Sequence, residues 1–136
     1  WERNNVEILM MEGHQFECPW TGKKLLSSNY DIDHLLPISV YPLNELWNLV
    51  PSDRDFNQHK KRDRMHSYER LKVAHPRLVR TYQNSTVSKV LSPILSKDAG
   101  GRFPQLAYRS DLPLVLADAV VSYLETVAVS RNMAVF

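Results

Sequence analysis

Cysteine is nearly absent from this sequence, which contains one, Cys18, among 136 residues. A single cysteine can form no internal disulfide and excludes zinc sites built from several cysteines. This usage is typical of a reducing compartment, so we expect a cytoplasmic protein. Uninterrupted apolar runs are also short of a membrane span, and the N-terminus has no signal-peptide pattern. We therefore expect no membrane partner.

The composition that remains is ordinary for a globular domain. Hydrophobic residues make up 43% and charged residues 24% of the chain, and this length suffices to bury a core without disulfides. We expect a single domain over residues 1–136. Because the chain opens on Trp1 rather than methionine, we also expect it to be a part of a larger protein.

Positive charge is concentrated in one segment, although the formal net charge is only +2. Residues 54–80 contain nine Lys or Arg and three Asp or Glu, whereas the rest of the chain contains eight and twelve. Charge alone favours an exposed helix face with salt bridges. Because the segment lies beside an Asp-His pair, we favour a polyanion as its partner.

The first half of the chain predicts one helix, a turn, and two short strands joined by an irregular loop. The apolar residues before Gly13 indicate a short N-terminal helix that stops at this glycine. Alternation of apolar and polar residues predicts the first strand, and two prolines keep the following loop irregular. The segments are 1–15 for the helix, 16–24 for the turn, and 30–35 and 47–50 for the strands.

The second half of the chain predicts helices. Ser52 or Asp53 is suited to cap a helix that runs to about residue 65. A sustained apolar register begins at Leu112 and predicts a long packing helix, buried on more than one side or docked on a partner. Between them we expect helices over 67–75, 76–83 and 86–96, with Pro76 in a first turn, Pro93 as a break, and Gly100 and Gly101 as a separator.

The chemistry is concentrated at the end of the first predicted strand, in Asp33 and His34. Hydrolysis of a phosphodiester needs an activated water and stabilisation of developing charge, and a divalent cation provides the latter. We expect Asp33 to bind that cation and His34 to act as general base, since the pKa of imidazole lies near neutrality. Adjacent strand residues face opposite ways, so a strand end or bulge must bring both to one phosphate.

The basic helix supplies further candidates. Asn57 and Lys60 lie three residues apart on one face, so Asn57 can complete the metal site while Lys60 neutralises phosphate. Because Mg²⁺ takes few protein ligands, one carboxylate and one amide or imidazole suffice. His59 competes with Asn57 as the ligand, and an imidazole there favours a transition metal.

Other residues of this segment are expected to support the site. Asn48 can use both ends of its amide to fix the loop near His34, which is a scaffold role. Four basic residues are predicted to bind the nucleic-acid backbone in a salt-dependent manner: Arg54, Lys61, Arg62 and Arg64. The remaining histidines, His14, His66 and His75, lie in no carboxylate-rich segment and are expected to be structural or exposed.

In this order of elements the chain resembles the HNH endonucleases, whose site is a hairpin and a helix known as the ββα-metal fold. Asp33-His34, then Asn48, then Asn57 followed by Lys60 match the family pattern. The resemblance covers about residues 16–64. The turn CPWTGK at residues 18–23 also resembles the branch without zinc that includes the HNH domains of CRISPR RNA-guided nucleases. It implies that no structural zinc is present.

The resemblance implies an α+β fold, with a small ββα-metal core at residues 16–65 and a helical extension of unassigned role at 66–136. It also implies a Mg²⁺- or Mn²⁺-dependent DNA endonuclease, with Asp33 and Asn57 as ligands and His34 as base. Two alternatives stay open. One is a catalytically weak ββα module that binds nucleic acid or protein; the other is an effector or toxin nuclease whose helical extension binds a protein partner or a larger complex.

Overall fold

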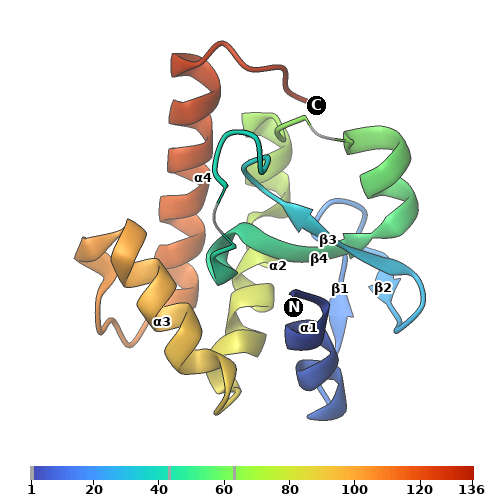
Figure 1. Cartoon of the computed structure of the whole chain (residues 1–136), viewed down its shortest axis with the longest axis vertical. Coiled ribbons are helices and arrows are strands. Elements are labelled where there is room, and N and C mark those ends of the chain that lie inside the picture. The colour runs from blue at the N-terminus through green and yellow to red at the C-terminus, as the bar shows by residue number, and fades with distance from the viewer. Residues whose placement is uncertain (1, 43, 63) are drawn as a thin grey trace.

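The structure is a computed structural model that describes residues 2–42, 44–62 and 64–136. Trp1, Leu43 and Asp63 lie outside these residues. The predicted α+β class is confirmed, because two small hairpins are combined with helices (Figure 1). The helices are α1 (Glu2–Met11), α2 (Tyr68–Val87), α3 (Leu91–Arg102) and α4 (Leu112–Ser130), and the strands are β1 (Phe16–Glu17), β2 (Lys24–Leu25), β3 (Tyr30–His34) and β4 (Leu49–Asp53).

The N-terminal elements follow the local sequence closely. Helix α1 ends before Gly13, whose φ of 90° is accessible to glycine at little cost, so the predicted glycine stop is confirmed. The turn after it joins β1 to β2, with Phe16 paired to Leu25. Figure 1 shows α1 and these two strands on the side of the molecule away from α4.

The central hairpin of β3 and β4 is antiparallel and pairs Asp33 with Val50 and His34 with Leu49. The predicted strands are present, but the second begins later than expected. Residues 46–48 form the 3-10 helix η1 (Leu46–Asn48) instead of a strand. This tight turn carries Trp47 and Asn48, both fully buried, into the core before β4 begins.

The helix after β4 differs from the predicted one, which was an α-helix reaching about residue 65. A helical turn at 54–55 leads into the π-helix η2 (Phe56–Lys61), where the Arg62 amide bonds to the Asn57 carbonyl, five residues earlier, at 2.8 Å. Arg62 then adopts a φ of 55°, which ends the helix. Asp53 accepts a hydrogen bond from the Phe56 amide at 3.2 Å, as expected of a capping residue.

Two prolines and two glycines behave differently from the prediction. Helix α2 runs without a break through Pro76, because the helix buries one face on both sides of it, and this packing outweighs the lost hydrogen bond. Pro93 lies in the first turn of α3, where its missing N–H costs nothing. Gly100 and Gly101 are within α3 and separate nothing. The helices predicted over 67–75, 76–83 and 86–96 are therefore replaced by α2 and α3.

Helix α4 confirms the apolar register predicted from Leu112. By length and composition alone it could cross a membrane, but core helices pass the same test. Its charged residues Asp118 and Glu125 interrupt the apolar sequence, so no uninterrupted apolar run extends over the whole helix. In the structure α4 packs along α2 and buries seven residues, which is the behaviour of a core helix: Leu112, Leu116, Ala117, Val120, Val121, Leu124 and Val127.

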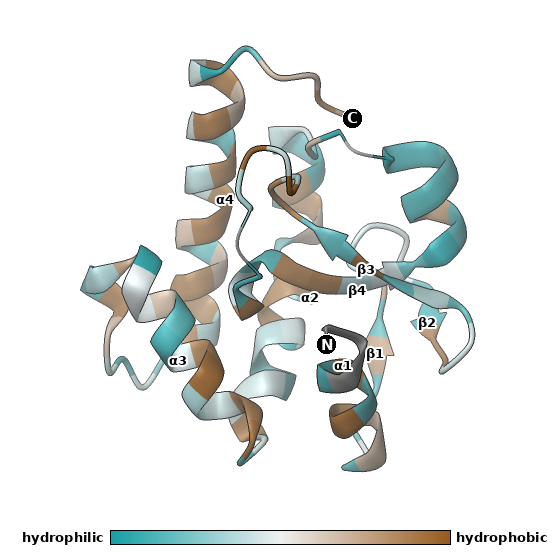
Figure 2. Ribbon diagram, in the orientation of Figure 1, coloured by the Kyte–Doolittle hydropathy of each residue, from teal (hydrophilic) through white to brown (hydrophobic). Residues whose placement is uncertain are grey.

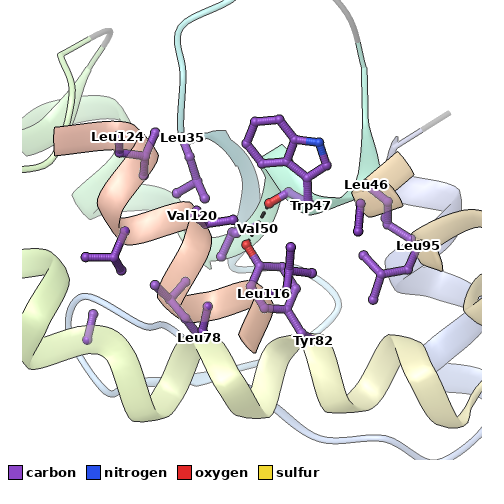
Figure 3. Close-up of a cluster of buried hydrophobic side chains, with 14 of the residues drawn as sticks. Leu35, Leu46, Trp47, Val50, Leu78, Tyr82, Leu95, Leu116, Val120 and Leu124 are labelled. Carbon is purple, nitrogen blue, oxygen red and sulfur yellow. Dashed lines mark hydrogen bonds between the residues drawn. The ribbon is translucent and has the colours of Figure 1, made fainter. Parts of the chain in front are cut away.

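The core connects these helices to the hairpin. In Figure 3, Trp47 lies among side chains from α2 and α4, and the Tyr82 hydroxyl donates a hydrogen bond to the Trp47 carbonyl at 2.7 Å. Both residues are almost fully buried. Figure 2 shows the contrast with η2, which is hydrophilic along most of its length. The apolar faces of α2 and α4 thus support one side of the hairpin, and the polar helix η2 lies away from them.

Candidate functional site

A cavity of about 330 Å³ opens where the end of β3 meets η2. The structure brings together five of the residues singled out in the sequence. Asp33 and His34 reach the cavity from β3, Asn57 and Lys61 from η2, and Arg62 from the residue that ends η2. The strand ends at His34, so these two adjacent side chains can line the same cavity.

Asp33 is the most enclosed of these residues, with 1% of its side chain exposed. The Lys61 ammonium donates to Oδ1 of Asp33 at 2.6 Å, and Nε2 of His66 lies 2.8 Å from Oδ2. Lys61 donates a second hydrogen bond, to the His34 carbonyl, at 2.9 Å. Both oxygens of the carboxylate are therefore engaged inside the protein.

The electrostatics of this cluster follow from burial and from its hydrogen bonds. Burial raises the pKa of the Asp33 carboxyl, but the His66 hydrogen bond and the Lys61 charge outweigh it and hold that pKa below its usual range. Burial lowers the pKa of His66 despite Asp33 beside it. We therefore describe His66 as a neutral imidazole that donates its Nε2–H to an ionised Asp33, with Lys61 as the counter-ion.

His66 is held in place from two directions. The Trp20 ring stacks on it with centroids 3.5 Å apart, so the turn at residues 18–23 contacts the site through this tryptophan. The flanking residue Met65 forms a parallel bridge with Val135, which fixes the backbone. Within the described residues, His66 Nδ1 has no hydrogen-bond partner, which is consistent with an unprotonated nitrogen of a neutral ring.

The predicted role of Lys60 does not fit the geometry. Lys60 is exposed and does not line the cavity, whereas Lys61 is buried and does. The physical reason is the π-helical turn, because i to i+5 bonding spreads one turn over more residues than in an α-helix. The residue that returns to the face of Asn57 is consequently Lys61. Lys61, predicted to bind the nucleic-acid backbone, instead pairs with Asp33.

His34 is half-buried, and its Nε2 lies 3.4 Å from Oδ1 of Asn44. The backbone that follows His34 is held by Asn48, which is fully buried. The Asn48 amide accepts from the Leu36 N–H at 2.8 Å and donates to the Leu36 carbonyl at 3.1 Å. Both ends of the Asn48 amide thus bind the loop next to His34.

Asn57 and His59 take different positions. Asn57 lines the cavity with Asp33 and His34. His59 is exposed and pairs with Asp55 at 2.8 Å, one turn earlier on the outer face of the helix. The structure thus places Asn57 in the same cavity as the candidate metal ligand Asp33 and leaves His59 outside it.

The arginines predicted to bind nucleic acid differ in their contacts. Arg54 donates to the Tyr30 carbonyl at 3.2 Å and lies 3.7 Å from Asp31, so it is tied to the hairpin. Arg64 donates to the carbonyls of Lys60 and Lys61 at the end of η2. Arg62 is exposed and lines the cavity. Of the three, only Arg62 is placed to meet a phosphate in the cavity.

The donors in the cavity suit a small, hard cation. Asp33 supplies carboxylate oxygens and Asn57 an amide oxygen, and Mg²⁺ binds few protein ligands while keeping several waters. In the part of the chain that the structure describes, no three His, Cys, Asp or Glu side chains gather as a metal-binding group. A cation here would therefore rely on one carboxylate and one amide, and it would meet Lys61 and His66 already bonded to Asp33.

Sequence reasoning missed three residues of this site. His66 was expected to be structural or exposed because its partner Asp33 is 33 residues away in sequence. Asn44 lies in a loop with no regular pattern, and Trp20 contacts the site only through His66. His75, also expected to be structural or exposed, pairs with Asp118 at 2.6 Å. No local signal marks any of these pairs, since each joins separate elements.

Comparison with known proteins supports the resemblance. Residues 18–66 match the family described as HNH endonuclease, about a third of the chain, and this segment contains every cavity residue and His66. The resemblance to this family is confirmed over that segment, and it suggests nuclease activity. No curated protein and no solved structure matches the chain. The likeness to the CRISPR branch stays a prediction.

Proposed function

Because residues 18–66 match the HNH endonucleases, we propose that the chain is a metal-dependent DNA endonuclease that hydrolyses phosphodiester bonds. One observation supports this most. A carboxylate, an imidazole, an amide and two cationic side chains, all within the matched segment, line a single cavity of about 330 Å³. These are the groups that a one-metal phosphodiesterase site requires.

The metal would be held by Asp33 and Asn57, with Mg²⁺ or Mn²⁺ as the ion that fits oxygen donors. When bound, such an ion supplies positive charge that stabilises the phosphate oxygens and the departing 3′ oxygen. HNH nucleases generally use a divalent metal. His59 plays no part in this proposal, since it pairs with Asp55 outside the cavity.

His34 acts as the general base in this proposal. An imidazole that donates from Nε2 to Asn44 carries its lone pair on Nδ1, so Nδ1 can take a proton from water. Asn48 fixes the backbone of the following loop through both of its hydrogen bonds to Leu36. The two asparagines therefore orient the imidazole, one by its ring nitrogen and one by its backbone.

Arg62 is proposed to bind a phosphate of the substrate. It is exposed at the rim of the cavity, and guanidinium groups bind phosphate in a bidentate manner. Lys60 lies on the outer face of η2 and contributes charge to backbone binding at a distance. Arg54 and Arg64 hold the hairpin and the end of η2 through their hydrogen bonds to carbonyls, so their main contribution is to the shape of the site.

The proposal is tested by cleavage of supercoiled plasmid DNA with Mg²⁺ or Mn²⁺. We expect the wild type to nick one strand per engagement and His34→Ala to cut at least about 100-fold more slowly, as for loss of a general base. His59→Ala is the matched control, because it removes an imidazole outside the cavity, and it should cut like the wild type. Equal cutting by wild type and His34→Ala, or no cutting with any divalent metal, contradicts the proposal.

One observation favours a second candidate, a ββα module that binds nucleic acid and cuts poorly. Both oxygens of Asp33 are already engaged by Lys61 and His66, so a cation meets competition at its carboxylate ligand. Salt-dependent DNA binding without cleavage in the plasmid assay would support this candidate. A single-stranded DNA and an RNA substrate in the same assay separate DNA cleavage from a wider nuclease activity.

A further inference from the structure

We propose that the Lys61 ammonium occupies the metal position in the metal-free protein, and that a divalent cation binds Asp33 only by displacing it. This inference rests on the proposed function, because both concern the same carboxylate. Lys61 is then an internal competitor of the metal. Its affinity for Asp33 sets the metal concentration at which the site fills.

The first support is the set of atoms around the ammonium. Nζ of Lys61 lies 2.6 Å from Oδ1 of Asp33 and 2.9 Å from the carbonyl oxygen of His34. Carboxylate and carbonyl oxygens are the ligands that Mg²⁺ and Mn²⁺ prefer. The side chains of the pair are only 3% and 1% exposed. A unit positive charge therefore lies in an oxygen-lined position, on the carboxylate proposed as the metal ligand.

The second support is that each oxygen of the Asp33 carboxylate already accepts a hydrogen bond. Oδ2 of Asp33 is engaged by His66 at 2.8 Å. A cation that shared Oδ1 with Lys61 would lie roughly 2 Å from that oxygen, within about 5 Å of the ammonium. Like charges at such a distance repel strongly where water is excluded. The metal and the Lys61 ammonium therefore exclude each other at Asp33.

The third support is that Lys61, and not His66, is able to leave. Lys61 lines the cavity, and its four-carbon stem is flexible enough to turn the ammonium away from Asp33. It is also the last residue of η2, beside Arg62 with its positive φ. His66, by contrast, does not line the cavity and is stacked under Trp20 with centroids 3.5 Å apart.

The pair also explains why a lysine is useful at this position. Burying a carboxylate without a neighbouring cation costs free energy. This cost is lower if the carboxyl group is protonated or if a positive charge lies beside it. Lys61 supplies that charge while the metal is absent. The site is thus kept ready for a cation without exposing Asp33 to solvent.

The test measures Mn²⁺ binding to the full chain by calorimetry, without DNA. Lys61→Met removes the ammonium and keeps an apolar stem, and we expect it to bind Mn²⁺ at least tenfold more tightly than the wild type. Lys60→Met is the matched control, since it removes the same charge one residue earlier on the exposed face. We expect its affinity to stay within twofold of the wild type.

Thermal unfolding gives a second measurement that is independent of cleavage. Metal-free Lys61→Met should unfold at a lower temperature than Lys60→Met, and Mn²⁺ should raise its midpoint more than that of the wild type. If Lys61→Met does not fold without metal, Lys61→Gln, which can still donate to Asp33, replaces it. We expect this variant also to bind Mn²⁺ more tightly than the wild type.

Unchanged or weaker Mn²⁺ binding in the Lys61 variants overturns the inference. If wild type also cuts DNA with metal in that case, the proposed function stands and only the role of Lys61 is wrong. Tighter binding in the Lys61 variants without DNA cleavage by any form leaves the inference standing and contradicts the nuclease proposal. Absence of both metal binding and cleavage in every form contradicts both.

Discussion

Two histidine–aspartate pairs lie in different regions of this molecule and differ mainly in their surroundings. His66 and Asp33 pair at 2.8 Å, with side chains 0% and 1% exposed, and of the two only Asp33 lines the cavity. His75 and Asp118 pair at 2.6 Å between α2 and α4, with side chains 26% and 63% exposed. The shorter contact is the more exposed one. Distance alone therefore does not show which pair contributes more to stability, because water screens the second pair and is excluded from the first.

The largest expected effect comes from breaking the enclosed pair. His66→Ala removes the Nε2–H donor of Asp33 and leaves a void under Trp20, and we expect a loss of about 3 kcal/mol of unfolding free energy. His75→Ala, the matched control, removes the same side chain from the exposed pair and should cost less than about 1 kcal/mol. Urea unfolding measures both. Equal losses would show that burial does not separate the two pairs.

The next effect concerns a buried polar residue without charge. Asn48→Ala leaves both the N–H and the carbonyl of Leu36 without their partner in a water-free position, and we expect a loss of about 2 kcal/mol. Asn44→Ala is the control, because its contact with His34 is exposed. It should leave the urea midpoint nearly unchanged and slow plasmid cleavage. A similar urea midpoint for the two variants would contradict this expectation.

The smallest effect tests a carboxylate of intermediate burial. Burial raises the pKa of Asp98, and the negative Glu45 adds to this, although the Leu46 N–H opposes it. The folded state therefore binds the Asp98 proton more tightly than the unfolded state. Its stabilising contribution is complete at low pH and is lost as pH rises through the raised pKa.

Asp98→Asn removes this titration and keeps an oxygen that can accept from the Leu46 amide. Its stability relative to the wild type should rise between pH 3.8, the ordinary value for an aspartate, and neutrality. We expect a gain below about 1 kcal/mol at pH 7 because the group is partly exposed. Urea unfolding across this pH range measures it, and a relative stability that falls with pH contradicts the assignment.

Much of the central hairpin could be predicted from sequence. Alternation places the first strand at residues 30–35, and the structure has β3 at Tyr30–His34. The apolar register from Leu112 predicts α4 because a helix with a buried face repeats its apolar residues at fixed intervals. Pro76 was wrongly predicted to lie in the first turn of a helix, whereas it lies inside α2. Proline disfavours a helix interior locally, but the packed face of α2 is not visible to a local rule.

The candidate site, like the fold, could be predicted only in part from the sequence. Asp33 and His34 were singled out from their adjacency at a strand end, and the structure has both at the cavity. Lys60 was expected beside Asn57 because an α-helical register was assumed, but η2 is a π-helix and Lys61 lines the cavity instead. His66 was missed because the segment that carries it is positioned by the bridge between Met65 and Val135, 70 residues apart in sequence.

The sequence by itself determined which chemical groups are available and where the hairpin and the long apolar helix begin. These features depend on neighbours within a few residues, and local preferences act over that range. Only the tertiary structure decided that Lys61 and His66 share Asp33 and that Asn57, not His59, lines the same cavity as Asp33. These partners meet because separate elements pack together, and the exclusion of water by that packing gives the enclosed pair its expected strength.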